Sequence, residues 1–316
     1  MDVSAFIKKT DWQKAGISLA LFTICLVFTM ASDKFLTVRN LTNVARQVSI
    51  LALVSYGQTF VIMTGGIDIS IGFLVSLVSM VAAGAMKTTG SIPLGILMGI
   101  LCGTAVGIVN GVMISYVGIA SFIVTLGMMT VCQGLALLAA DGMPILGLPT
   151  GFGIIGSGYI GPIPIPVIIA FIFFLICAFF LRYTTLGRYV LAIGGNEEAC
   201  RLSGINTKLV KLVAYSLLGF LAGVGAVVLA SRVISGYPNL GLGMELQSIA
   251  AVVIGGCTLG GGSGTMLGTL LGVLMIGVIQ NGLNLLGVSS FIQMIVIGMI
   301  IIISVWYDTF RKGKTG

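Results

Sequence analysis

Long apolar runs alternate with short polar segments along this chain. A helix of about twenty apolar residues crosses the hydrocarbon core of a bilayer. Runs of this kind lie at 15–31, 48–64, 70–86, 93–116, 119–140, 164–181, 212–231, 245–260, 265–286 and 288–306. Residues 35–47 predict a short amphipathic helix at the membrane interface. The pattern predicts an all-α integral membrane protein of about ten transmembrane helices, with a single domain over residues 1–316.

Two stretches of the chain resemble each other. Residues 103–128 and 268–299 both open with Gly-Thr-x-x-Gly, and both contain Ser-Phe-Ile. Extended backwards, the similarity pairs spans two to five (about 48–140) with spans seven to ten (about 212–306). The offset of five spans is odd, so the copies are expected to be two inverted four-helix repeats with a solute path between them. Phe122 and Phe291, from the Ser-Phe-Ile segments, are candidates for lining or gating that path.

Glycines recur at every fourth position in both copies. Helical residues four apart share a face, so each series predicts a groove that lets a neighbouring helix approach closely. The two series are Gly95, Gly99, Gly103, Gly107 and Gly111, and Gly264, Gly268 and Gly272.

Composition supports the membrane assignment. Apolar residues make up 57% of the 316 positions and charged residues only 8%, whereas a soluble domain has about a quarter charged residues. The chain has no histidine, which excludes imidazole metal sites and histidine-based nucleophile activation. Its six cysteines lack CxxC spacing and are typical of small apolar residues rather than metal ligands.

The net charge of +7 is placed at the ends of apolar runs. Positively charged residues favour the cytoplasmic side of a membrane. The loop at 182–211 and both ends of the chain are basic, whereas the loop at 141–161 has no Lys or Arg. We therefore expect a multi-pass membrane protein with both termini in the cytoplasm. The terminal basic residues are Lys8, Lys9, Lys14, Arg311, Lys312 and Lys314, and the residues that oppose this orientation are Lys34, Arg39 and Arg46.

Two carboxylates lie inside or beside apolar runs. Asp68 is in the segment TGGIDISIG and Glu245 in GLGMELQSIAAVVIGG, both at glycine-rich helix entrances. Charges inside a membrane are costly and are usually functional, which makes both residues candidates for a solute path or gate. A carboxylate at a helix N-terminus can instead cap backbone N–H groups. The sequence leaves both interpretations open.

Side-chain amides provide further polar candidates in the apolar runs. Gln58, Asn110, Gln247 and Asn281 could form hydrogen bonds to a neutral solute that carries hydroxyl groups. Amides inside a membrane also join helices to each other, so this alternative remains open.

The segment GGNEEACRLSGI, from Gly194 to Ile205, predicts a short surface helix. Asn196 suits an N-cap, Glu197 and Glu198 suit the first turn, and Gly204 suits the position after the helix. Such a helix between two spans favours docking to a cytoplasmic partner, with Arg201 part of the same surface. An ATP site is not expected in this chain, because the glycine-rich stretch 255–264 lacks the lysine of a Walker A loop.

Four blocks in order, GGIDISIG, GGNEEACRLSGI, ELQSIAAVVIGGCTLGG and NGLNLLGVSSFIQMIVIGMIII, resemble the ribose/xylose/galactose-type ABC permease family. Cys257 stands where the family usually has Thr. The resemblance implies a membrane subunit of a monosaccharide importer in the bacterial inner membrane. It also implies pairing with a second permease copy, which is either identical or related. It further implies a periplasmic binding protein that delivers the solute and separate cytoplasmic ATPase subunits that bind ATP–Mg. Residues Asn196 to Gly204 would be the coupling helix.

Three alternatives are weighed against this reading. An ion-coupled secondary transporter would use Asp68 or Glu245 as its ion site. An ABC permease of the same family could carry a nucleoside or the autoinducer-2 signal instead of a sugar. A membrane-embedded enzyme lacks support, because the chain offers no histidine, metal cluster or activated nucleophile.

Overall fold

The computed structural model describes the backbone of residues 3–313 and the side chains of residues 15–303 and Trp306. The side chains of Lys8, Lys9, Lys14, Arg311 and Lys312, and the whole of Lys314, lie outside the described residues. The long helices are α1 (Val3–Ala31), α2 (Val38–Met63), α3 (Ile71–Thr89), α4 (Ile92–Val112), α5 (Ser121–Leu138), α7 (Ile165–Tyr183), α10 (Thr207–Val233), α11 (Met244–Ile254), α12 (Met266–Leu285) and α13 (Ser290–Gly313).

Shorter elements connect these helices. They are the π-turn η1 (Met113–Val117), the 3-10 turn η2 (Thr150–Phe152), α6 (Gly153–Ser157), α8 (Thr185–Gly195), α9 (Glu197–Leu202), and the strands β1 (Tyr159–Ile160) and β2 (Ile163–Pro164). The two strands pair antiparallel, with Tyr159 opposite Pro164.

A helix occupies each of the ten predicted apolar ranges. Six helical segments are long and apolar enough to cross a membrane: α3, α4 continued by η1, α5, α7, α10 and α12. Shorter apolar helices cover Ala15–Ala31, Met244–Ile254 and Ser290–Ile303. The prediction of a helical membrane protein with several spans is confirmed.

Two predicted boundaries are wrong. Residues 35–47 do not form a separate interfacial helix, because Thr37 caps a continuous α2 that runs from Val38 to Met63. The run at 245–260 is helical only as far as Ile254. The chain then turns at Gly256, whose φ of +89° favours glycine.

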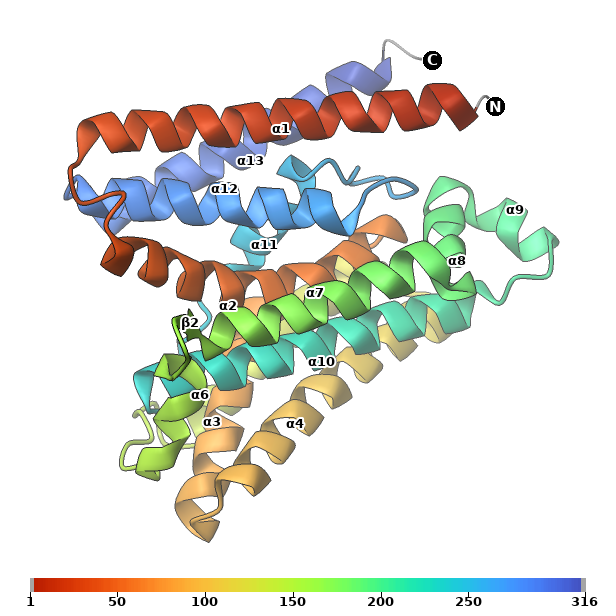
Figure 1. The fold of residues 1–316 in the computed structure, drawn as a ribbon. Helices are drawn as coiled ribbons and strands as arrows, with labels where there is room; N and C mark the ends of the chain where they lie inside the picture. Colours follow the sequence, from red (N-terminus) through yellow and green to blue (C-terminus); the bar gives the residue numbers. More distant parts are fainter. Residues whose placement is uncertain (1–2, 314–316) are drawn as a thin grey trace.

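The antiparallel pair α2 and α10 forms the centre of the molecule (Figure 1). A Cβ atom added at Gly57 of α2 would lie 2.7 Å from the Cα atom of Leu218 in α10. Further along, Gly225 of α10 packs against Val54 of α2. Residues 48–63 of α2 are all buried, so this helix contacts protein rather than lipid on every side.

The glycine series on α4 forms the predicted close contact with a neighbouring helix. Gly103 and Gly107 face Gly219 of α10 so closely that a Cβ on Gly219 would lie 2.3 Å from the carbonyl oxygen of Gly103. In the second series, Gly268 and Gly272 of α12 pack on the backbone of α11. Gly264 lies before α12 begins and so does not belong to that helical groove.

The two ends of the bundle differ. The first turn of α1, the last turn of α13 and α9 lie at one end, whereas α6 and the β1–β2 hairpin lie at the other (Figure 1).

Candidate functional site

A break in the helical path separates α2 from α3. Residues 64–70 are not helical, and Gly65 has a φ of +80° that favours glycine. Non-helical backbone at membrane depth is tolerated where protein covers it or where it lines a cavity. Asp68 and Ser70 of this break are buried, whereas Gly65 is exposed.

Asp68 holds the break together. One carboxylate oxygen, Oδ1, accepts hydrogen bonds from the backbone N–H of Ser70 (2.8 Å) and from the Ser70 hydroxyl (2.6 Å). The other, Oδ2, accepts from the side-chain amide of Asn110 in α4 (3.1 Å), which also donates to the Ser70 hydroxyl (3.2 Å). Gln58 of α2 donates to the backbone carbonyl of Asp68 (3.2 Å). Three elements therefore converge on this one residue.

Two acceptors in this network have no partner among the described residues, namely Oδ1 of Asn110 and Oε1 of Gln58. Buried polar atoms are usually satisfied by protein or by ordered water. The structure thus brings together three predicted site residues, Asp68, Gln58 and Asn110, around a polar centre with spare acceptor capacity.

Glu245 approaches the same helix end from α11. Its carboxylate is buried in the first turn of α11, and its Oε2 has no hydrogen-bond partner among the described residues. A Cβ added at Gly72, in the first turn of α3, would lie only 1.9 Å from this oxygen. Asp68 and Glu245 therefore flank the N-terminus of α3, where free N–H groups and the helix dipole favour negative charge. The Asp68 carboxylate accepts a hydrogen bond from the backbone N–H of Ser70, the N-cap residue of α3, rather than from an N–H group of the first turn of that helix. Glu245 lies beside the first turn of α3.

The remaining predicted path residues lie elsewhere. Asn281 forms a reciprocal amide pair with Asn40 (2.8 Å in each direction), which joins α12 to α2. Gln247 is partly buried on α11. Phe122 and Phe291 begin α5 and α13 and are 56% and 79% exposed, so they face the outside of this single chain rather than the polar centre.

A cavity of about 340 Å³ adjoins the break on the side of α9. Thr64, Gly65 and Gly66 form one wall, and η1 together with the turn at Gly118–Ser121 forms a second. The third wall contains Glu197, Lys211 and Tyr215. Asp68 is not among the residues that line this cavity.

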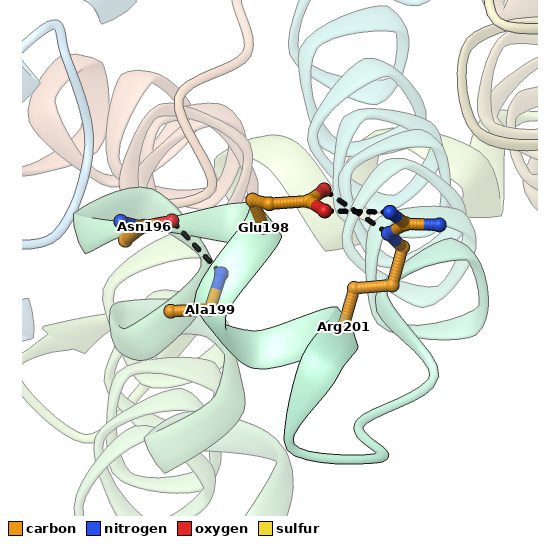
Figure 2. A network of polar contacts seen from close by, with 4 residues as sticks. All are labelled: Asn196, Glu198, Ala199 and Arg201. Atoms are coloured by element: carbon orange, nitrogen blue, oxygen red, sulfur yellow. Dashed lines mark hydrogen bonds and ion pairs between the residues drawn. The ribbon is translucent and has the colours of Figure 1, made fainter.

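The helix α9 projects from the bundle (Figure 1) and carries its own polar contacts (Figure 2). The side-chain oxygen of Asn196 accepts from the backbone N–H of Ala199 (2.9 Å), as expected for an N-cap. Gly204 has a φ of +81°, as expected for a residue that ends a helix. Cys200 of α9 is buried and belongs to the hydrophobic core.

Two ion pairs on α9 differ in their surroundings. Glu198 and Arg201 contact each other through two hydrogen bonds (3.0 and 2.5 Å), and their side chains are 62% and 66% exposed. These hydrogen bonds hold the pKa of the Glu198 carboxyl below its usual value and raise the pKa of Arg201. Glu197 instead pairs with Lys211 of α10 (2.5 Å), and Lys211 is only 20% exposed.

Sequence reasoning missed two residues of this region. Ser70 follows Asp68 by two positions, a spacing at which an Asp side chain often bonds to the backbone, so a signal existed. Tyr215 lies in an apolar run, and its only adjacent polar residue, Ser216, does not single it out. Among the described residues, no group of three His, Cys, Asp or Glu side chains could hold a metal ion.

Comparison with known proteins identifies the class of protein to which this fold and polar centre belong. Residues 40–305 match the family described as branched-chain amino acid transport system, permease component, and the chain belongs to this family. It is therefore a membrane subunit of a transporter and not an enzyme.

Several curated relatives align along nearly the whole chain. The ribose import permease of Bacillus subtilis is 45% identical, covering 94% of this chain and 92% of that protein. The ribose import permease of Escherichia coli K12 is 40% identical, covering 93% of both chains. The L-arabinose ABC transporter permease of Azospirillum brasilense is 35% identical, covering 96% of this chain and 90% of that protein. No solved structure matches this chain.

Proposed function

We propose that this chain is the membrane-spanning subunit of an ATP-binding-cassette importer for a monosaccharide, with a ribose-like pentose as the first candidate. The observation that carries the proposal is the 45% identity to a ribose import permease over 94% of the chain. The polar centre supports it, because amide and hydroxyl groups suit a neutral solute with many hydroxyl groups. Permeases of ABC importers work in general with an ATPase and a solute-binding protein.

The arrangement that we propose has ten transmembrane helices, with both termini and α9 in the cytoplasm. The first turn of α1, the last turn of α13 and the basic loop around α9 share one end of the bundle, which supports this orientation (Figure 1). A cytoplasmic ATPase that binds ATP–Mg would dock on α9, and a periplasmic binding protein would dock at the opposite end. A second permease copy, identical or related, would complete the membrane part.

Helix contacts support two inverted repeats, α2–α5 and α10–α13. Within the first, α3 packs on α4 and α5, and within the second, α11 packs on α12 and α13. Across them, α10 packs on α3 and α4, whereas α2 packs on α11 and α12. The turn before α5 and the turn before α13 each contain a glycine with positive φ, Gly118 and Gly287. This pattern is what a pseudo-two-fold axis through the antiparallel pair α2 and α10 would produce.

Reconstituted vesicles test the proposed function. The chain, its cognate ATPase and its binding protein are assembled, and uptake of labelled pentoses, hexoses, inositol and nucleosides is measured with and without ATP. Uptake of a pentose that requires both ATP and the binding protein supports the proposal. Uptake of a nucleoside would point to the non-sugar alternative. Uptake that ignores ATP and follows an ion gradient would contradict it, and would favour the ion-coupled alternative with Asp68 or Glu245 as the ion site.

Docking of the ATPase on α9 has its own test. Glu198, Arg201 and Leu202 are strongly exposed on this helix, so replacing all three with Ala is expected to weaken copurification of the ATPase without unfolding the membrane part. The exposed Ile160 in the hairpin at the other end provides a control, because its replacement with Ala should leave copurification unchanged. Equal copurification of both variants would argue against α9 as the coupling helix.

A further inference from the structure

Two arginines lie at the end of the bundle opposite α9, where α2 begins and α10 ends (Figure 1). Arg46 comes just before residues 48–63, the part of α2 that is buried throughout, and Arg232 is the second-last residue of α10. Both residues are partly buried. They therefore lie where long buried segments of the bundle end, the level at which lipid headgroups are expected.

The segment that links α6 to β1 holds the two arginines near each other. Arg46 donates from Nη2 to the backbone carbonyl of Ser157 (2.8 Å), and its guanidinium lies 4.5 Å from the centre of the Tyr159 ring. A Cβ added at the neighbouring Gly156 would lie 2.2 Å from the backbone nitrogen of Arg232. The same short segment therefore contacts both arginines, which lie close enough to repel each other.

Neither arginine has a negatively charged partner in the part of the chain that the structure describes. The ion pairs among these residues involve α9, at the opposite end of the bundle. The Nε atom of Arg46 is buried without a hydrogen-bond partner, and no hydrogen bond or ion pair joins the guanidinium of Arg232 to a described residue. Like charges that are partly buried together are costly unless an anion lies near them.

The chemistry of the pair suits a phosphate group. A guanidinium presents its N–H donors in a planar fork that matches the oxygens of a phosphate, and these charge-assisted hydrogen bonds are strong. In the orientation proposed above, the two arginines lie on the side of the membrane that positively charged residues usually avoid. An anionic headgroup would neutralise both charges there.

The surface around the two arginines is apolar and aromatic. Tyr159, Ile160 and Ile163 of the hairpin and Val233 and Ile234 at the end of α10 are all exposed. Tyrosine is enriched at the level of lipid headgroups, where its ring has apolar surroundings and its hydroxyl reaches water. A basic site with an apolar border suits a phospholipid, because the phosphate of a lipid is joined to apolar chains. A free anion or the acidic surface of a soluble protein would leave the apolar border without a matching partner.

We propose that Arg46 and Arg232 form a binding site for the phosphodiester group of an anionic phospholipid, in the leaflet at the end of the bundle opposite α9. The Nε–H group of Arg46 and the guanidinium of Arg232 donate to the phosphate oxygens, and the rest of the lipid lies against the exposed apolar residues around them. This site goes beyond the proposed function, because it does not depend on which solute is transported.

Lipid binding to the full-length chain in detergent tests the site. Native mass spectrometry measures the affinity for phosphatidylglycerol, which is anionic, and for phosphatidylcholine, whose positive choline group the arginines repel. Arg46→Gln and Arg232→Gln are each expected to weaken phosphatidylglycerol binding about fivefold, the usual effect of one basic residue near anionic lipid. Arg39→Gln is the matched control, because it removes the same charge from an exposed position of the same helix. Equal losses in Arg39→Gln and Arg46→Gln would overturn the proposal.

A second measurement is independent of any general loss of stability. The thermal unfolding midpoint of each variant is compared between micelles that contain phosphatidylglycerol and micelles that contain phosphatidylcholine. The wild type and Arg39→Gln are expected to unfold at a higher temperature with phosphatidylglycerol, whereas Arg232→Gln should lose most of this difference. Arg232→Gln is expected to fold, because its guanidinium makes no hydrogen bond or ion pair to a described residue. An undiminished difference in Arg232→Gln would overturn the proposal.

Two further results would assign the arginines to a different anion. Excess inorganic phosphate is not expected to displace phosphatidylglycerol, because a free ion does not contact the apolar border. Displacement by inorganic phosphate would identify a site for a free anion and would overturn the lipid assignment. Unchanged phosphatidylglycerol binding in Arg46→Gln and Arg232→Gln, together with weaker binding of the solute-binding protein, would show that the arginines contact an acidic protein surface instead.

Discussion

At the scale of the residue, both carboxylate oxygens of Asp68 accept hydrogen bonds. Its two carboxylate oxygens receive donors from Ser70 and from Asn110, and together these contacts fix the backbone between α2 and α3. In an Asp68→Asn variant, the side-chain amide has one acceptor oxygen instead of two. The second donor can be accommodated if Asn110 turns its amide over, because the unpartnered Oδ1 of Asn110 would then face the new NH₂ group.

Asp68→Asn is therefore expected to preserve the fold, whereas Asp68→Ala leaves buried donors unpaired and should destabilise it by about 1–3 kcal/mol. Thermal unfolding of the two variants in detergent measures the difference. Equal losses of stability would mean that the charge of Asp68, and not its acceptor geometry, supports the break.

The exposed Glu198–Arg201 pair gives a prediction about pH. The folded-state pKa of Glu198 is lowered, so the pair contributes stability above the ordinary carboxyl pKa of about 4.3 and loses it as pH falls through the lower folded value. Carboxyl-carbon NMR of labelled glutamate is expected to show a Glu198 midpoint below the ordinary value. In Arg201→Ala the midpoint should return to it. An unchanged midpoint in this variant would remove Arg201 as the cause.

At the scale of the element, close glycine contacts decide how helices approach each other. Gly107 of α4 lies against the backbone of α10, since a Cβ there would be 2.4 Å from the carbonyl oxygen of Tyr215. Gly127 of α5 has no atom within 4 Å of its added Cβ. Replacing each glycine with alanine therefore distinguishes the effect of helix packing on stability from the effect of helix propensity.

Gly107→Ala is expected to force α4 and α10 apart and to destabilise the protein by about 1–3 kcal/mol, the usual range for overpacking. Gly127→Ala is expected to be neutral or slightly stabilising, because alanine favours a helix more than glycine does. Unfolding of both variants in mixed detergent micelles checks this. A neutral Gly107→Ala would mean that the α4–α10 contact tolerates an added methyl group.

Much of this architecture is predictable from the sequence, but the contact partners of the polar side chains are not. Length and apolarity predict the helices, and four-residue spacing predicts the α4 groove, because both depend only on local periodicity. Asp68 and Glu245 are visible as rare charges in apolar runs. Spacing says nothing about which distant residues meet them, so the contacts of Asp68 with Asn110 and of Glu245 with Gly72 could not be predicted. The position of Tyr215 at the cavity wall could not be predicted for the same reason, because it depends on the fold.

At the scale of the whole molecule, polar contacts join the first part of the chain to the last. Asn40 and Asn281 exchange two hydrogen bonds, Gln47 donates to Gln280 (3.0 Å), and the hydroxyls of Thr59 and Thr269 are 2.7 Å apart. All three contacts connect α2 to α12. Asn281 was a candidate for the solute path, and its contacts here match the alternative in which an amide joins helices.

A double-mutant cycle measures this connection. Asn40→Ala, Asn281→Ala and the double variant are expected to give a coupling free energy of about 0.6–1.7 kcal/mol, the range found for hydrogen bonds between membrane helices. Stability in detergent provides the measurement. A coupling near zero would show that each amide finds an equally good partner when the other is removed.

The α2–α12 contacts also bear on how the protein is made. Residues 40 and 281 are separated by most of the chain, so the ribosome releases the amides of α2 long before their partners exist. Until then, α2 presents these polar groups to lipid or to the insertion machinery. A nascent chain that stalls before α12 therefore carries a persistent polar surface inside the bilayer, a feature by which membrane quality control could distinguish an unfinished protein from a complete one.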